Sequence, residues 1–96
     1  MITKETLRQK RDDITRIAAK HGAINIRVFG SVARDQSRQG SDLDLLIDVG
    51  PKTSSWFPAG LILDLESLLG CHVDIVTENG LNPELRDRVL TEAIPI

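Results

Sequence analysis

Hydrophobic residues along the chain follow a helical period in some segments and a strand period in others. In the first segment the apolar residues recur three, four or seven positions apart: Leu7, Ile14, Ile17 and Ala18. This spacing places them largely on one side of a helix. Thr3 has a side chain suited to an N-cap, and Gly22 after His21 is a typical C-terminal signal. The pattern therefore predicts one amphipathic helix between Thr3 and His21.

Three later segments alternate with a period of two, which is typical of half-buried strands. From Ile24 to Phe29, one predicted face carries Ile24, Ile26 and Val28. From Asp42 to Val49, one face carries Leu43, Leu45, Ile47 and Val49, and the other carries Asp42, Asp44, Leu46 and Asp48. The third predicted strand runs from His72 to Thr77.

Helical spacing returns in two further segments. One is ended by Gly70 and has the apolar residues Leu61, Ile62, Leu65, Leu68 and Leu69. The other begins at Asn82-Pro83, a cap residue followed by a first-turn proline. Because three strands alternate with helices, the fold class is α/β (α+β), with a small mixed sheet of three or more strands flanked by helices.

The composition is that of one folded domain and excludes several other classes. Of the 96 residues 41% are apolar and 27% are charged, which excludes a disordered or Pro/Gly-rich chain. A chain of this length forms one hydrophobic core, so we predict a single domain, residues 1–96. It has one cysteine, Cys71, and no apolar run approaching about 18 residues. With no secretion signal at its start, we expect a protein of the reducing cytoplasm that enters no membrane.

The net charge of −2 is unevenly divided along the chain. Residues 1–40 hold nine Lys and Arg against four acids, for +5, whereas residues 41–96 hold three against ten, for −7. A basic part suits phosphate groups or an acidic partner, and an acidic part suits metal cations. In the first helix we interpret most charges as a solvated face, because they recur every four residues: Arg8, Asp12, Arg16 and Lys20.

A glycine-serine pair and two aspartates form the first part of a candidate site. Gly30-Ser31 ends the first predicted strand, and Asp42 and Asp44 open the second after ten intervening residues. If these strands pair antiparallel, the two ends lie side by side. Gly30 then lets a phosphate approach the backbone, and the Ser31 hydroxyl with nearby amides can donate to its oxygens. Arg34, one turn further on, could add a positive charge.

The aspartates are suited to a hard cation. Residues two apart on a strand point the same way, with Cα atoms about 6.5–7 Å apart, so the Asp42 and Asp44 carboxylates can converge. A cation relieves their repulsion, and oxygen ligands select Mg²⁺ or Mn²⁺ over zinc, for which the chain lacks a Cys/His set. Asp74 supplies a third carboxylate if its strand lies beside the second, and two ions about 3.5–4 Å apart can then be held. Asp48 lies roughly 13 Å along the strand from Asp44, and we interpret it as a solvated acid.

These residues together resemble a known family. The run from Phe29 to Arg34, its spacing to Asp42 and Asp44, and the segment His72–Val76 resemble the nucleotidyltransferases of the DNA polymerase beta superfamily. Over nearly its whole length, including the stretch from Asn82 to Pro95, the chain is similar to the minimal nucleotidyltransferases, the antitoxins that pair with HEPN-domain toxins. The resemblance implies the palm-like nucleotidyltransferase fold of polymerase beta.

The resemblance also implies a role for each matching residue. Gly30 and Ser31 match the phosphate-contacting pair, Asp42 and Asp44 the metal-binding pair, and Asp74 the third catalytic carboxylate. Antitoxins of this group, in type VII toxin-antitoxin systems, transfer AMP from ATP with Mg²⁺ to a tyrosine hydroxyl of the HEPN toxin, which blocks its RNase activity. The partners implied are therefore ATP and a HEPN toxin, with no direct contact with nucleic acid.

Two features leave alternatives open. The family usually has glycine where Asp35 stands, and this acid either weakens nucleotide binding or points outward at the start of the loop. Trp56 and Phe57 either form a lid over the nucleotide, anchor a partner, or cover the edge of the core.

The function itself also has alternatives. The acids on one face favour an enzyme over a catalytically silent module that masks the toxin, because a masking protein needs no mutually repelling carboxylates. A third alternative, transfer of AMP to a small molecule or an RNA end, is weakened because the chain has little material for a substrate domain.

Overall fold

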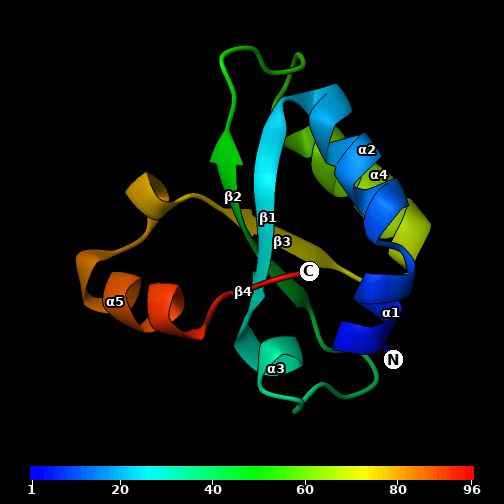
Figure 1. Ribbon diagram of the computed structural model, residues 1–96, viewed down its shortest axis with the longest axis vertical. Coiled ribbons are helices and arrows are strands. Elements are labelled where there is room, and N and C mark those ends of the chain that lie inside the picture. The colour runs from blue at the N-terminus through cyan, green and yellow to red at the C-terminus, as the bar shows by residue number, and fades with distance from the viewer.

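The fold is built on a four-stranded mixed sheet in the order β3-β2-β1-β4. The computed structural model describes residues 1–96, and the strands are β1 (Ala23–Phe29), β2 (Leu43–Val49), β3 (Val73–Val76) and β4 (Ile94–Pro95) (Figure 1). β1 pairs antiparallel with β2 and with β4, and β3 pairs parallel with β2. The expected α/β class is confirmed, as are the antiparallel pairing of the first two strands and the place of the third beside the second.

The helices divide between the two sides of this sheet. Three of them, α1 (Lys4–Gln9), α2 (Arg11–His21) and α4 (Ala59–Leu69), gather on one side, whereas α5 (Pro83–Glu92) lies on the other (Figure 1). The short helix α3 (Gly30–Ala33) follows β1, and the 3₁₀ turn η1 (Glu78–Gly80) follows β3. No helix is long and apolar enough to span a membrane.

The main core contains fourteen buried apolar residues contributed by these helices and the sheet. Its largest fully buried side chains include Leu7 and Ile14 from the first helices, Leu43 and Leu45 from β2, and Leu61 from α4. Leu46 is also buried but lies outside this cluster, because it leaves β2 on the face that carries Asp44. That second face has much less apolar cover, and it is the face on which the candidate site lies.

The single long helix predicted at the start of the chain is divided in two. Thr3 caps α1 as expected, accepting a hydrogen bond from the Thr6 amide at 3.2 Å. At Lys10, however, the backbone leaves the helical region, with φ −103° and ψ 11°, and α2 starts at the next residue. The Lys10 ammonium donates to the Leu68 carbonyl of α4 at 3.3 Å, a tertiary contact that residue spacing alone does not indicate.

The predicted face of Ile24 was wrong because β1 contains a bulge. Ile24 pairs with Asp48 but Arg27 pairs with Leu46, so β1 has one extra residue here. The extra residue is accommodated at Asn25, whose φ of +54° is a left-handed conformation that asparagine tolerates. As a result Ala23 is buried and Ile24 is 54% exposed, while Ile26 and Val28 keep their predicted place in the core.

His21 ends α2 as the sequence pattern predicts, and its ring is also buried between two partners. Its Nδ1 lies 2.7 Å from the Ser54 hydroxyl, and its Nε2 lies 2.7 Å from Asp64 Oδ2. The hydrogen bond between His21 and Asp64 is the main reason that the pKa of Asp64 is lowered. Through these two contacts His21 connects α2 with the loop after β2 and with α4. The ring also lies against Gly60 of α4, where a Cβ would come within 2.9 Å of it.

Candidate active site

The sheet register brings two of the predicted acids side by side. Asp44 on β2 is the register partner of Asp74 on parallel β3, and Phe29 at the end of β1 pairs with Asp44 on the other side. Register partners on adjacent strands lie about 4.8 Å apart and point to the same face. Asp42 precedes β2 by one residue and is exposed beside this pair. Two carboxylates at the start of β2 and a third from β3, thirty residues further along the chain, thus lie near one another at one end of the sheet.

The electrostatics of Asp44 reflect this crowding. Its pKa is raised, first by partial burial and then by the negative charges of Asp74 and Asp42. Arg34 opposes the shift, and Glu92 adds to it. A raised carboxyl pKa means that the ionised form is disfavoured in the folded protein, so a cation at this place would be stabilised by Asp44 and would relieve its repulsion. A carboxyl pKa raised by burial and by neighbouring acids is a common feature of functional sites.

Gly30 lies directly against Asp44. Its backbone has φ +76°, and a Cβ built on it would be 2.2 Å from Asp44 Oδ2. Both observations require glycine: the left-handed conformation disfavours a side chain, and the space a side chain would need is taken by the carboxylate. Gly30 begins α3 and Ser31 follows in its first turn. The expected neighbourhood of Gly30-Ser31 and the aspartates is confirmed.

Arg34 lies at the C-terminal end of α3 but is already paired within the protein. Its Nη1 donates to Glu92 Oε1, and its Nε donates to Gln36 Oε1 at 3.1 Å. Glu92 was not among the acids predicted for this cluster. The signal for it was available, because Glu92 lies three residues after the buried Val89 and therefore on the same side of α5.

Asp35 points away from the aspartates. Its carboxylate forms an ion pair with Lys4 of α1 at 3.1 Å and is largely exposed to solvent. The backbone at Asp35 has φ +57°, the left-handed region that favours glycine and that aspartate tolerates better than most residues. Of the two alternatives for this residue, the structure therefore supports the outward one.

Two other residues lie too far from the carboxylates to act with them. Asp48 is bound by Arg27 and by Asn25, each at 2.8 Å, so it is paired and not simply solvated as predicted. Trp56 is strongly exposed in the loop after the end of β2, whereas Asp42 lies before its start (Figure 1). The lid hypothesis for Trp56 is therefore wrong, and Phe57 packs against the edge of the core.

The three carboxylates supply oxygen donors but do not form a closed metal cage. No group of three or more acidic, histidine or cysteine side chains converges closely enough to hold a metal by itself. Mg²⁺ is commonly bound by one or two carboxylates together with phosphate oxygens and water, so a preformed cage is not required. The donors available at Asp42, Asp44 and Asp74 are all oxygens, which suits this ion.

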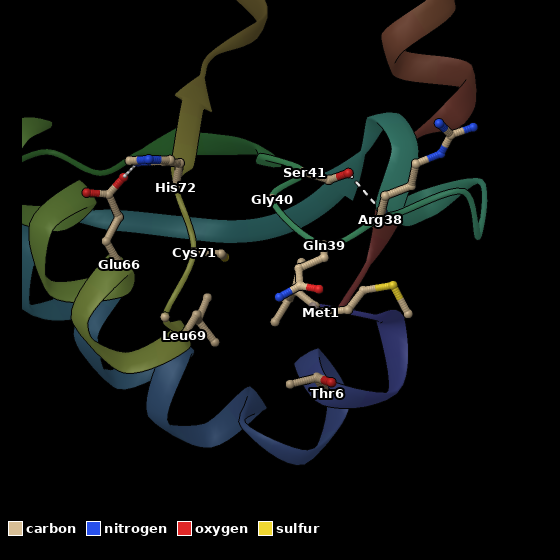
Figure 2. A pocket seen from close by; sticks show the side chains of 12 residues that line it. Met1, Thr6, Arg38, Gln39, Gly40, Ser41, Glu66, Leu69, Cys71 and His72 are labelled. Carbon is tan, nitrogen blue, oxygen red and sulfur yellow. Dashed lines mark hydrogen bonds and ion pairs between the residues drawn. The ribbon is translucent and has the colours of Figure 1, made fainter.

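A pocket of about 530 Å³ opens beside this site, on the side of the sheet that carries α1 and α4. It lies between the start of the chain, residues 38–41 and the connection from α4 to β3, with Glu66 and His72 at one edge (Figure 2). Its Cys71 thiol has a pKa raised by burial and by the charges of Glu66 and Asp42, so it is a protonated, unreactive thiol.

The family model and the relatives that match this chain are nucleotidyltransferases, and the relatives are named protein adenylyltransferases. A family model described as a nucleotidyltransferase domain matches residues 7–96. A Methanocaldococcus jannaschii protein assigned to the protein adenylyltransferases, MJ0435, is 39% identical over 80 residues, which cover 83% of this chain and 86% of that protein. The protein adenylyltransferase MntA of Thermococcus cleftensis is 35% identical over 75 residues, covering 78% of this chain and 76% of its own.

Solved structures agree on the fold. One assigned as a minimal nucleotidyltransferase has a TM-score of 0.84 at 50% identity and covers 99% of this chain and 97% of its own. A crystal structure of a toxin-antitoxin with AMP-PNP has a TM-score of 0.72 at 21% identity, covering 88% of this chain and 69% of its own. At that identity the second likeness is one of fold alone. The fold expected from the sequence is confirmed.

Proposed function

This chain belongs to the nucleotidyltransferase domain family, and we propose that it is an antitoxin that transfers AMP from ATP to a tyrosine hydroxyl of a HEPN-domain RNase toxin. The observation that carries the proposal is the register of Asp44 with Asp74 beside Gly30, because it places two carboxylates directly against the glycine-serine turn. The protein adenylyltransferase name of the relatives supports AMP as the group transferred. The chain contains no tyrosine, so the acceptor lies outside these 96 residues.

We propose that Gly30 and Ser31 bind the triphosphate of ATP. Without a side chain, Gly30 lets the turn after β1 lie directly against Asp44, and the Ser31 hydroxyl of that turn donates to a phosphate oxygen. Arg34, whose guanidinium lies at the end of the same short helix, neutralises part of the phosphate charge. These groups hold the α-phosphate still with respect to the acceptor hydroxyl, which is the main contribution that positioning makes to phosphoryl-type transfer.

We propose that Asp42 and Asp44 hold Mg²⁺ together with phosphate oxygens, with Asp74 completing a site for a second ion. When bound, Mg²⁺ neutralises charge that develops on the phosphates and lowers the pKa of the attacking hydroxyl. Asp74 lies beside Asp44 and accepts the proton of that hydroxyl. A bond forms between the acceptor oxygen and the α-phosphorus, the bond from that phosphorus to the β-phosphate oxygen breaks, and pyrophosphate leaves.

The test of this function uses labelled ATP. The purified chain is incubated with ATP labelled in the α-phosphate, Mg²⁺ and the product of the adjacent gene, and both label on that product and its RNase activity are measured. We expect label on the product and loss of RNase activity. Neutralisation without label would support the alternative, a catalytically silent module that masks the toxin.

We further propose that residues 1–96 act as a single domain in the cytoplasm, where ATP is available.

Gly30→Ala is expected to reduce transfer about 10²-fold, the scale associated with misplacing a reactive group by about 1 Å. The new Cβ would lie 2.2 Å from Asp44 Oδ2, so the carboxylate must rotate away from its place. Gly70→Ala is the matched control, because Gly70 has a similar φ of +70° and open space around it. Both variants should lose thermal stability because of the positive φ, Gly30→Ala at least as much as Gly70→Ala, while only Gly30→Ala loses the rate of transfer. Equal rates in both variants would contradict this role for Gly30.

A further inference from the structure

Glu92 is a fourth acidic side chain near the carboxylate cluster. It is the last residue of α5, and its side chain is only 17% exposed. The helix end that carries it is fixed on both sides, because the Ala93 amide donates to the Val89 carbonyl and Ile94 pairs with Val28 of β1. Its charge lies close enough to Asp44 to contribute to the raised pKa of that residue. Glu92 is thus a largely but not fully buried acid with a fixed backbone.

Arg34 is the cation that compensates Glu92. Its guanidinium is bound along one edge, with Nη1 donating to Glu92 and Nε donating to Gln36. The Nη2 group has no hydrogen-bond partner within the protein, and the side chain is 41% exposed. A guanidinium held by two acceptors in this way keeps its remaining donors in a fixed direction, whereas a free arginine side chain samples many rotamers.

We propose that Glu92 is a positioning residue that holds the Arg34 guanidinium beside Asp44, so that its unpaired donor is available to the triphosphate of ATP. Glu92 acts through Arg34 and does not itself contact the nucleotide, because its carboxylate is occupied by the ion pair. The proposal links the C-terminal helix to the phosphate-binding turn, two segments 58 residues apart in the sequence. It rests on the nucleotide-binding role proposed for Arg34.

The experiment compares nucleotide affinity in four proteins. Binding of a fluorescent ATP analogue with Mg²⁺ and the KM and kcat for AMP transfer are measured for wild type, Glu92→Ala, Glu92→Gln and Asp87→Ala. Asp87→Ala is the control, because Asp87 is an exposed acid of the same helix that forms no ion pair. We expect Glu92→Ala to raise Kd and KM about 10-fold with kcat within about 3-fold, the scale of one lost charge-assisted hydrogen bond.

Glu92→Gln separates positioning from packing. Glutamine keeps the volume and one acceptor oxygen for Arg34 Nη1, so its Kd is expected between those of wild type and Glu92→Ala. Thermal unfolding of each variant shows that the fold is retained. An unchanged Kd in both Glu92 variants would overturn the proposal, and so would a lower Kd, because that result would mean that Glu92 competes with phosphate for Arg34.

A double substitution identifies the route of the effect. If Glu92 acts only through Arg34, then Arg34→Ala and Arg34→Ala/Glu92→Ala have the same Kd for the nucleotide analogue. Additive losses would overturn the proposal and give Glu92 a direct contact with the nucleotide. Failure of the proposed function gives a different pattern: wild type then binds the analogue without transferring AMP to the partner, and the ordering of Kd values among the variants still decides the role of Glu92. If wild type binds no nucleotide, both proposals fail.

Discussion

Asp44→Asn is expected to reduce AMP transfer by about 10³-fold or more, since the metal-assisted stabilisation it removes is worth several kcal/mol. The change keeps the shape of the side chain and therefore its packing beside Gly30. It removes the negative charge of Asp44, which the charges of Asp74 and Asp42 repel. Without that charge the remaining acids hold a divalent cation weakly, and Mg²⁺-dependent nucleotide binding should fall together with the rate. The measurements are transfer of α-labelled AMP and binding of a fluorescent ATP analogue with and without Mg²⁺.

The same variant should be at least as stable as wild type at neutral pH when no divalent cation is present. The folded-state pKa of Asp44 is raised, so its ionised form destabilises the fold above that pKa, and protonation removes this cost as the pH falls through it. Asparagine removes the cost at every pH. The difference in thermal midpoint between the two proteins should therefore shrink in acid.

Asp48→Asn is the matched control for Asp44→Asn. Asp48 lies on the same strand and is bound by Arg27 and Asn25 far from Gly30. This control should lose some stability with its ion pair but keep the rate of transfer. If Asp44→Asn transferred AMP as fast as Asp48→Asn, the carboxylate cluster would not be the catalytic site.

The sequence was informative about the strands that carry the site because their pattern is local. Alternation over Asp42–Val49 predicts a strand with Asp42 and Asp44 on one face. In the structure Leu43–Val49 forms β2, and Asp42 lies one residue before it. The spacing of Gly30 and Asp42 indicates that they become neighbours once the strands pair antiparallel, and the pairing is antiparallel. Periodicity and turn residues determine these features, and both can be read without knowing distant contacts.

The features that the sequence did not indicate depend on tertiary contacts or on single backbone angles. The bulge at Asn25 reverses the exposure of Ile24 through one φ value, which alternation cannot indicate. β4 has two residues and exists only because β1 offers an edge for Ile94. The ion pairs Arg34–Glu92 and His21–Asp64 join residues 58 and 43 positions apart, so no local pattern indicates that these side chains pair.

The preference for glycine at the position of Asp35 illustrates the same limit. The resemblance to the nucleotidyltransferase family implies that glycine is usual there, and the structure offers a reason, a φ of +57°. The pattern alone left open whether the acid disturbs a bound phosphate. The ion pair with Lys4 answers this, because it directs the carboxylate toward α1.

Asp74→Asn is expected to leave nucleotide binding within about 3-fold of wild type while reducing transfer about 10³-fold, the scale of general-base assistance. Asp74 is exposed on β3 and lies at the edge of the cluster, next to Asp44 but on the far side from Gly30. Phosphate contacts proposed for Gly30, Ser31 and Arg34 therefore remain intact in the variant. The loss should appear in kcat and not in the Kd for the ATP analogue.

The contrast with Asp44→Asn makes the assignment of Asp74 testable. Asp44 is proposed to hold Mg²⁺ with the triphosphate, so its loss weakens binding and rate together, whereas Asp74 is proposed to take the proton of the acceptor hydroxyl. If Asp74→Asn lost binding in the same proportion as transfer, Asp74 would be a ligand of the nucleotide-bound cation instead of the base. If transfer were unchanged, the proton would leave by another route, and the register of Asp74 with Asp44 would have no part in the chemistry.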